Sequence, residues 1–291
     1  MANEQNKQSL IVAWWNTSRN PPRQKRKHAV WSRVYSVVKK LCCDSDIVFL
    51  GEYLIEDRLR KLLDEINSRF RRHGIDKEMM IDGRVTEEIG DDFRMACIFN
   101  RRMMVPGDVH DFRCYQDLFC EDAEGDDYYR VGIRFPFFML SWDAAKIDFV
   151  ASHWSQYSEM DSNEVKIEAA CQLRRCLSAD RYVIALGDYN LEPYGHALAT
   201  LGATRSEQYA FDHEGLYNPF WRLLNDENGT LRATNKRMLK TYFPLFDQMM
   251  CNRTFVSEKF KCNPEICDKE YIKKLKRGEH YPIKLTLQKG E

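Results

Sequence analysis

One stretch of the sequence decides the fold class: Arg181-Tyr182-Val183-Ile184-Ala185-Leu186-Gly187-Asp188-Tyr189-Asn190. Its short apolar run is typical of a buried strand that ends at the glycine. In an extended segment residues i and i+2 point to the same side, so Asp188 and Asn190 are expected to project together from the strand's carboxyl end. A carboxylate beside an amide suits a metal, a water or a phosphate oxygen. The same residue types are common in turns, so this motif alone leaves both interpretations open.

Three other apolar runs end in the same way. The run 10–15 stops at Asn16, the run 46–50 stops at Gly51 and Glu52, and the run 146–152 stops at His153. Apolar residues at helical spacing over 30–41, 59–70 and 163–177 predict amphipathic helices between these strands, which indicates an α/β protein. Ligand sites in such proteins often gather at strand ends. Any one of these polar residues alone is more often structural, but the four endings together predict one carboxylate-rich pocket with a histidine.

The rest of the chain is less regular. Strands are expected at 95–99 and 131–140, as antiparallel neighbours, and at 241–250, where Asp247 lies inside the strand. A short basic helix is expected from Asp268 to Arg277 and a final strand from Ile283 to Leu287. The region of about 195–240 is predicted to be rich in loops. Because no internal repeat or linker stands out, a single domain over residues 1–291 is favoured.

Composition excludes some classes of protein. The 291 residues include 44 Lys and Arg and 44 Asp and Glu, so attraction for a polyanion must come from a local patch. No apolar run is long enough for a transmembrane helix, and the polar N-terminus lacks the features of a secretory signal. The ten cysteines are scattered, with no CxxC pair, which indicates reduced thiols in a cytoplasmic protein.

The order of the short motifs resembles that of the endonuclease/exonuclease/phosphatase superfamily, over residues 10–287. The resemblance implies a two-sheet β-sandwich flanked by helices, in four layers αββα, with the strand-end residues meeting at one edge. The most specific motif is the Gly-Asp-Tyr-Asn element. The motifs that carry the resemblance are Trp15-Asn16, Leu50-Gly51-Glu52, Ser152-His153-Trp154, Gly187-Asp188-Tyr189-Asn190, Phe246-Asp247-Gln248-Met249 and Glu279-His280-Tyr281-Pro282.

The resemblance also implies a metal site. It makes Glu52 a direct Mg²⁺ ligand and Asn16 its companion, and Mn²⁺ could replace Mg²⁺. His153 would bind the scissile phosphate, and Asp188 and Asn190 would position the attacking water and the phosphate. Hydrolysis of a phosphodiester needs neutralisation of charge and an in-line nucleophile, and a hard cation held by carboxylates supplies the first of these.

The last two motifs supply the remaining catalytic residues. Asp247 resembles the aspartate of the family's penultimate strand, and His280 resembles the histidine of its terminal Ser-Asp-His motif. Here Gly278-Glu279-His280 replaces that motif, so Glu279 stands where the family has aspartate. A histidine with an unperturbed pKa of about 6.5 can serve as a general base or, when protonated, hold the phosphate. Whether Asp188 or His280 takes the proton stays open at this point.

Basic side chains near the predicted site favour a nucleic-acid substrate, because they contact backbone phosphates without reading sequence. The leading interpretation is a Mg²⁺-dependent nuclease acting on DNA or RNA. A phosphatase or phosphodiesterase acting on a small or lipid phosphate is an alternative, and a catalytically inactive binding module with the same fold is another. The basic residues fall in two segments, one with Arg23, Lys25, Arg26 and Lys27 beside Asn16, the other with Lys273, Lys274, Lys276 and Arg277 beside His280.

Overall fold

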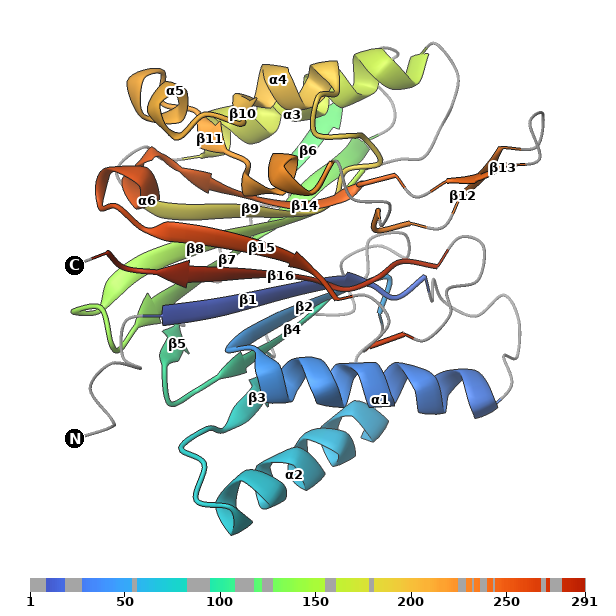
Figure 1. The fold of residues 1–291 in the computed structure, drawn as a ribbon, viewed down its shortest axis with the longest axis vertical. Helices are drawn as coiled ribbons and strands as arrows, with labels where there is room; N and C mark the ends of the chain where they lie inside the picture. Colours follow the sequence, from blue (N-terminus) through green and yellow to red (C-terminus); the bar gives the residue numbers. More distant parts are fainter. Residues whose placement is uncertain are drawn as a thin grey trace.

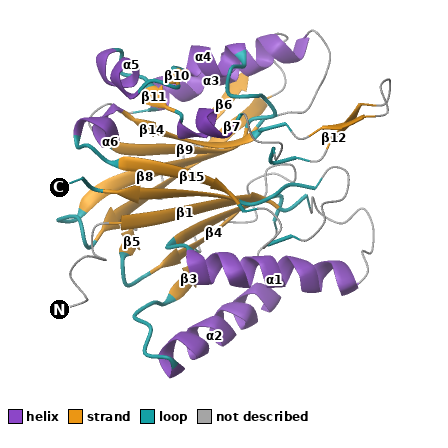
Figure 2. Ribbon diagram, in the orientation of Figure 1, coloured by secondary structure: helices purple, strands orange, loops and turns teal. Residues whose placement is uncertain are grey.

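Two β-sheets pack face to face, and helices cover the outer face of each (Figure 1). Figure 2 shows the two helical layers on opposite sides of the strands, which confirms the predicted αββα sandwich. The computed structural model of the chain describes residues 9–18, 28–53, 57–82, 95–107, 118–121, 128–154, 161–177, 181–224, 229–231, 233–235, 240–242, 244–267, 271–272 and 279–290.

The first sheet has six strands, in the order β15-β16-β1-β2-β4-β3. Strands β1 and β2 are parallel, joined through helix α1, and the other neighbours are antiparallel. Helices α1 (His28–Asp44) and α2 (Asp57–Arg72) cover the outer face, where their apolar stripes meet side chains of the sheet. The strands are β1 (Ser9–Asn16), β2 (Ile47–Gly51), β3 (Met79–Ile81), β4 (Met95–Asn100), β15 (Lys261–Ile266) and β16 (Ile283–Gln288).

The second sheet has the order β10-β11-β14-β9-β8-β7-β5, and β6 pairs with β7. Strands β8 and β9 are parallel, joined through helix α3 (Asp161–Cys176), which covers this sheet together with α4 (His196–Leu201). The strands are β5 (Met104–Pro106), β6 (Leu118–Glu121), β7 (Tyr128–Met139), β8 (Ala145–His153), β9 (Tyr182–Asp188), β10 (Ala203–Thr204), β11 (Leu216–Tyr217) and β14 (Asp247–Asn252). The remaining elements are α5 (Glu207–Asp212), η3 (Pro219–Leu223), α6 (Arg253–Ser257) and the hairpin of β12 (Ala233–Asn235) and β13 (Lys240–Tyr242).

The main hydrophobic core lies between the sheets. Because side chains alternate along a strand, the adjacent Trp14 and Trp15 of β1 fall on opposite faces. Trp14 packs in the core between the sheets with Phe49 and Phe149, whereas Trp15 packs under the helices of the first sheet. No helix in the part of the chain that the structure describes is both long and apolar enough to cross a membrane.

Some expectations from the sequence differ from the structure. Strands β4 and β7 are not neighbours, because β4 pairs with β2 and β3 in the first sheet and β7 pairs with β8 in the second. The strand expected over 241–250 is interrupted around Pro244, with β13 before it and β14 after it. Of the expected helix 268–277 the structure describes Tyr271 and Ile272, which are not helical. The region 195–240 holds short elements, namely α4, β10, α5, β11, η3 and β12.

Candidate active site

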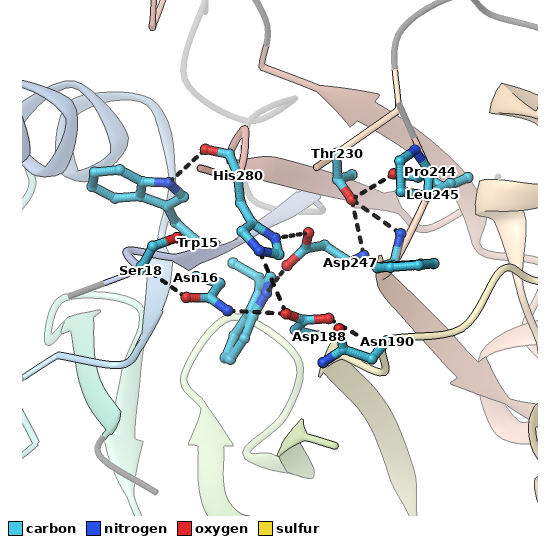
Figure 3. Close-up of polar contacts among 12 residues, drawn as sticks. Trp15, Asn16, Ser18, Asp188, Asn190, Thr230, Pro244, Leu245, Asp247 and His280 are labelled. Atoms are coloured by element: carbon cyan, nitrogen blue, oxygen red, sulfur yellow. Dashed lines mark hydrogen bonds and ion pairs between the residues drawn. The ribbon is translucent and has the colours of Figure 1, made fainter. Parts of the chain in front are cut away.

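Strand direction brings six polar side chains to one edge of the sandwich. In the parallel pairs, Asn16 lies opposite Gly51, which precedes Glu52, and His153 lies opposite Asp188. Strand β14 runs antiparallel to β9, so its first residue, Asp247, also lies opposite Asp188. His280 completes the group from the segment just before β16 (Figure 3). We call these six residues the edge site: Asn16, Glu52, His153, Asp188, Asp247 and His280.

Two carboxylates of the edge site converge on one amide. Asn16 Nδ2 donates hydrogen bonds to Asp188 Oδ2 at 2.9 Å and to Glu52 Oε1 at 3.3 Å. Its Oδ1 accepts from the backbone N–H of Ser18 at 2.9 Å, which orients the amide. His153 Nε2 lies 3.7 Å from Glu52 Oε1 and 3.8 Å from Asp188 Oδ2. The pair of carboxylates comes from different sheets, so packing of the sheets sets the distance between them.

Two residues of this region have left-handed backbone conformations. Glu52 has φ 52° and Asn190 has φ 49°. Asparagine tolerates this conformation, whereas glutamate rarely adopts it, so the surrounding contacts must hold the turn at Glu52 in place. Thr17 does so, because its Oγ1 donates to the carbonyl oxygens of Gly51 at 3.0 Å and Glu52 at 2.9 Å. The Glu52 side chain is therefore directed by a preorganised backbone.

The Asp188–Asn190 turn has a buried lysine behind it. The Asn190 backbone N–H donates to Asp188 Oδ1 at 3.0 Å, and Asn190 Nδ2 donates to the Trp154 carbonyl at 2.6 Å. Lys166 of α3 donates to the Asn190 carbonyl at 3.2 Å and is 6% exposed. Burial lowers the pKa of Lys166, while the nearby Asp188 carboxylate raises it. The sequence does not single out Lys166, because one lysine on a helix is ordinarily solvated.

His280 and Asp247 form a buried dyad. His280 Nδ1 lies 2.7 Å from Asp247 Oδ2, and His280 Nε2 lies 3.7 Å from Asp188 Oδ2. The other Asp247 oxygen, Oδ1, accepts from Trp14 Nε1 at 2.8 Å. The Asp247 backbone N–H donates to Thr230 Oγ1 at 3.0 Å (Figure 3). The sequence does not reveal the roles of Trp14 and Thr230, because a partner across the sandwich leaves no local pattern.

The charge of His280 differs from that of an ordinary histidine. Burial alone would lower its pKa, but Asp247, Asp188 and Glu52 outweigh burial and raise the pKa from 6.5 to about 9. The unperturbed pKa assumed from the sequence is therefore wrong for the metal-free protein. At neutral pH the ring is an imidazolium, which can donate a hydrogen bond from Nε2 but cannot accept a proton.

This pKa makes the stability of the metal-free protein depend on pH. The folded pKa of His280, about 9, exceeds the unfolded value of 6.5, so the folded state binds the proton more tightly. The contribution is complete below pH 6.5 and is lost as the pH rises through 9. We expect a loss of roughly 3 kcal/mol in the free energy of unfolding. Urea unfolding in the presence of chelator, between pH 6.5 and pH 9, measures this loss. His280→Asn should remove most of the slope, and an unchanged slope would contradict the assignment.

Glu279 has a partner on the helical side of the first sheet. Its Oε2 lies 3.4 Å from Nη1 of Arg33, which belongs to α1. The Glu279 side chain is 15% exposed and that of Arg33 is 32% exposed. Both line a small cavity together with Trp15, Thr17 and His280. An ion pair of this exposure stabilises a protein only weakly. The predicted substrate-binding residues Arg23, Lys25, Arg26 and Lys27, and the basic segment 273–277, lie outside the described residues.

The edge site has the donor chemistry for a metal ion. Ligand atoms of Asp188, Asp247 and His280 lie within 4.8 Å of one another, so this buried group could hold one. Both Asp247 oxygens accept hydrogen bonds, from Trp14 and from His280, and both Asp188 oxygens accept as well, from the Asn190 backbone and from Asn16. The convergence of Glu52 and Asp188 next to this group adds hard carboxylate oxygens, which Mg²⁺ prefers. The residues present therefore fit a divalent cation.

Solved structures share the whole architecture of the chain. The human Nocturnin catalytic domain, determined with a bound sulfate anion, has a TM-score of 0.61 at 12% identity and covers 97% of this chain and 94% of its own. An endonuclease/exonuclease/phosphatase family protein from Bacteroides thetaiotaomicron has a TM-score of 0.60 at 12% identity, covering 96% and 94%. D. rerio TDP2, complexed with a single-strand DNA product, has a TM-score of 0.56 at 14% identity, covering 96% and 99%.

The sequence comparisons are negative. No family model matches the chain, and no curated protein matches its sequence. At 12–14% identity the structural matches establish the fold and not the reaction. Each of these three matches spans nearly the full length of both aligned chains. The chain therefore has the endonuclease/exonuclease/phosphatase fold.

Proposed function

We propose that the protein is a Mg²⁺-dependent nuclease that hydrolyses phosphodiester bonds of DNA or RNA. The observation that carries the proposal is the edge site itself. Three carboxylates, two histidines and an amide from both sheets meet within hydrogen-bonding or ion-pairing distance of one another. Such a concentration of buried charge costs stability, so its retention favours a function in catalysis.

Glu52 and Asp188 would hold the cation, and Asn16 would keep the two carboxylates in place through its amide nitrogen. When bound, Mg²⁺ neutralises charge on the phosphoryl group and on the leaving oxygen. The left-handed backbone at Glu52 supports this role, since strained residues persist where the surrounding structure holds them for a purpose. Mn²⁺ has similar ligand preferences and should support activity as well.

The remaining residues divide the proton chemistry. Asp188 is the better candidate for orienting and deprotonating the attacking water, because His280 is already protonated at neutral pH in the metal-free protein. His280 would donate from Nε2 to a phosphate oxygen, with Asp247 holding its Nδ1. His153 would donate a charge-assisted hydrogen bond to a non-bridging oxygen, and Asn190 would help to orient the phosphate.

The choice of nucleic acid rests on the basic residues beside the edge site in the sequence. Arg23, Lys25, Arg26 and Lys27 follow Asn16, and such side chains bind backbone phosphates of any sequence. The D. rerio TDP2 structure with a single-strand DNA product shows that the same fold serves a protein bound to DNA. We assign these four residues to substrate binding as part of the proposal.

Nuclease assays with chelator controls test this function. We expect nicking of a supercoiled plasmid or cleavage of single-stranded RNA in Mg²⁺, loss of activity in EDTA, and recovery on addition of Mg²⁺ or Mn²⁺. A panel of phosphomonoesters, inositol phosphates and phospholipid head groups, assayed in parallel, serves as the comparison. Hydrolysis confined to that panel would contradict the nucleic-acid substrate, and full activity in EDTA would contradict the metal site.

A further inference from the structure

We propose that Trp14 is a positioning residue for the catalytic histidine, acting on His280 through Asp247. The inference rests on the proposed function, because it concerns the same site. Trp14, which is buried in the core between the sheets, thereby joins the residues that influence the reaction. Trp14 itself lies on β1 in the first sheet, whereas Asp247 lies on β14 in the second.

Both oxygens of the Asp247 carboxylate have a partner. Oδ1 accepts from Trp14 Nε1 at 2.8 Å, and Oδ2 lies 2.7 Å from His280 Nδ1. The terminal torsion of an aspartate side chain is broad and soft, so one hydrogen bond leaves the carboxylate plane loosely defined. A second hydrogen bond to the opposite oxygen fixes that plane. His280 Nε2 is then directed to Asp188 Oδ2, 3.7 Å away.

The indole ring of Trp14 is itself held firmly. It is fully buried in the core between the sheets. A Cβ at Gly51 would lie 2.7 Å from Trp14 Cη2 and 2.9 Å from Cζ2, so the ring occupies the space that a side chain at residue 51 would need. Glycine at this position therefore lets the ring approach the backbone of β2. Because the ring is closely packed, its Nε1 donor is held in a fixed position.

The neighbouring tryptophan, Trp15, contacts the other member of the dyad, His280. Trp15, on the opposite face of β1, donates from Nε1 to the His280 carbonyl at 3.1 Å (Figure 3). The two adjacent indoles thus contact the dyad from both faces of the sheet, one through the Asp247 carboxylate and one through the His280 backbone. Their effect is to define the position of the imidazolium relative to Asp188.

A purely structural explanation is that Asp247 merely supplies an acceptor for the buried N–H group of Trp14. Another tryptophan of the same core provides a comparison. Trp142 is 8% exposed and packs on Phe260 at 4.9 Å between ring centroids. Its Nε1 is buried and has no hydrogen-bond partner among the described residues. Among the described residues, therefore, Trp142 makes no such contact, whereas Trp14 Nε1 donates to the carboxylate that itself holds His280.

The test compares Trp14→Phe with Trp142→Phe, which removes the same atoms from the same core away from the dyad. Trp14→Phe should lower kcat roughly tenfold to a hundredfold with KM little changed, because a hydrogen bond to a charged group is lost. Trp142→Phe should keep kcat within about twofold, whatever its effect on the melting temperature. Equal kcat losses in the two variants, or a loss that follows the melting temperature, would overturn the proposal.

A double-mutant cycle tests whether Trp14 acts through His280. In a His280→Ala background, Trp14→Phe should cause no further loss of kcat, since the residue that it positions is absent. An additive loss in that background would mean that Trp14 acts by another route and would refute the proposal.

A spectroscopic measurement separates this inference from the proposed function. The proton between His280 Nδ1 and Asp247 Oδ2 should give a strongly downfield NMR resonance, assigned by its disappearance in His280→Ala. Trp14→Phe should shift or broaden it, and Trp142→Phe should not. An unchanged resonance in Trp14→Phe would overturn the positioning role even if the protein is an active nuclease. A shifted resonance in a protein without nuclease activity would uphold the positioning role and reject the nuclease.

Discussion

Replacing Asp188 with asparagine is expected to lower kcat for phosphodiester hydrolysis about a thousandfold or more, because in the proposed mechanism it removes both a metal-binding oxygen and the group that activates the water. The side chain lies at the centre of the edge site. Its Oδ2 accepts from Asn16 and lies 3.8 Å from His153 and 3.7 Å from His280. Asparagine has the same shape, but its amide oxygen can accept from only one of the two donors, Asn16 Nδ2 and the Asn190 backbone N–H, so the folded state of the variant is checked alongside its rate. The measurement is kcat at saturating Mg²⁺.

A buried carboxylate elsewhere provides the matched control. Asp148 lies on β8, is 1% exposed and pairs with Arg134 and Arg181. Asp148→Asn should lower the melting temperature, because it breaks a buried ion pair, yet leave kcat of the folded enzyme within about twofold. If Asp188→Asn retained a rate close to wild type, Asp188 could not be the group that activates water, and the proposed division of roles would be wrong.

His280→Asn is expected to lower kcat on the order of a hundredfold or more, within the usual range for acid–base groups. The asparagine Nδ2 can replace the Nδ1 donor to Asp247, so the dyad's buried hydrogen bond survives while the Nε2 atom facing Asp188 is lost. His280→Ala removes both and leaves Asp247 without one partner, which should also lower stability. Similar losses of kcat in the two variants would assign the effect to Nε2.

Variants of Glu279 complete this comparison. Its carboxylate pairs with the partly exposed Arg33, so Glu279→Ala should lower kcat less than His280→Asn does, and Glu279→Asp should retain activity. Arg33→Ala offers a matched control, because it removes the other half of the pair. A larger loss in Glu279→Ala than in His280→Asn would mean that Glu279 acts at the reaction centre.

The main strands and helices, and the polar residues that end the strands, can be predicted from the amino-acid sequence. The apolar runs before Asn16, Glu52, His153 and Asp188 correspond to β1, β2, β8 and β9. Hydrophobic periodicity is a local property, so it is readable without a structure. A strand–helix–strand order forces a parallel crossover, and parallel strands carry their carboxyl ends to the same edge. Within each sheet, the placement of Asn16 beside Glu52 and of His153 beside Asp188 follows from these rules, whereas the packing of the two sheets brings the two pairs together.

The assignment of strands to sheets needed the tertiary structure. The runs 95–99 and 131–140 both predict strands, yet the strands found there, β4 and β7, lie in different sheets. Alternation of side chains tells which face of a strand is buried but not which strand lies beside it. Strand β15 was missed altogether, since its exposed side chains at an edge of the first sheet leave no continuous apolar run.

The electrostatics of the site and the contacts that hold it depend on how the two sheets pack together. Trp14 and Asp247 are 233 residues apart, and their hydrogen bond exists because the two sheets pack face to face. The pKa of His280, about 9, depends on carboxylates brought from three other segments, and Coulomb energy depends on distance rather than on sequence order. Lys166 likewise becomes part of the site only because α3 packs behind the Asp188–Asn190 turn. These properties arise from distances between segments, which no local pattern in the sequence records.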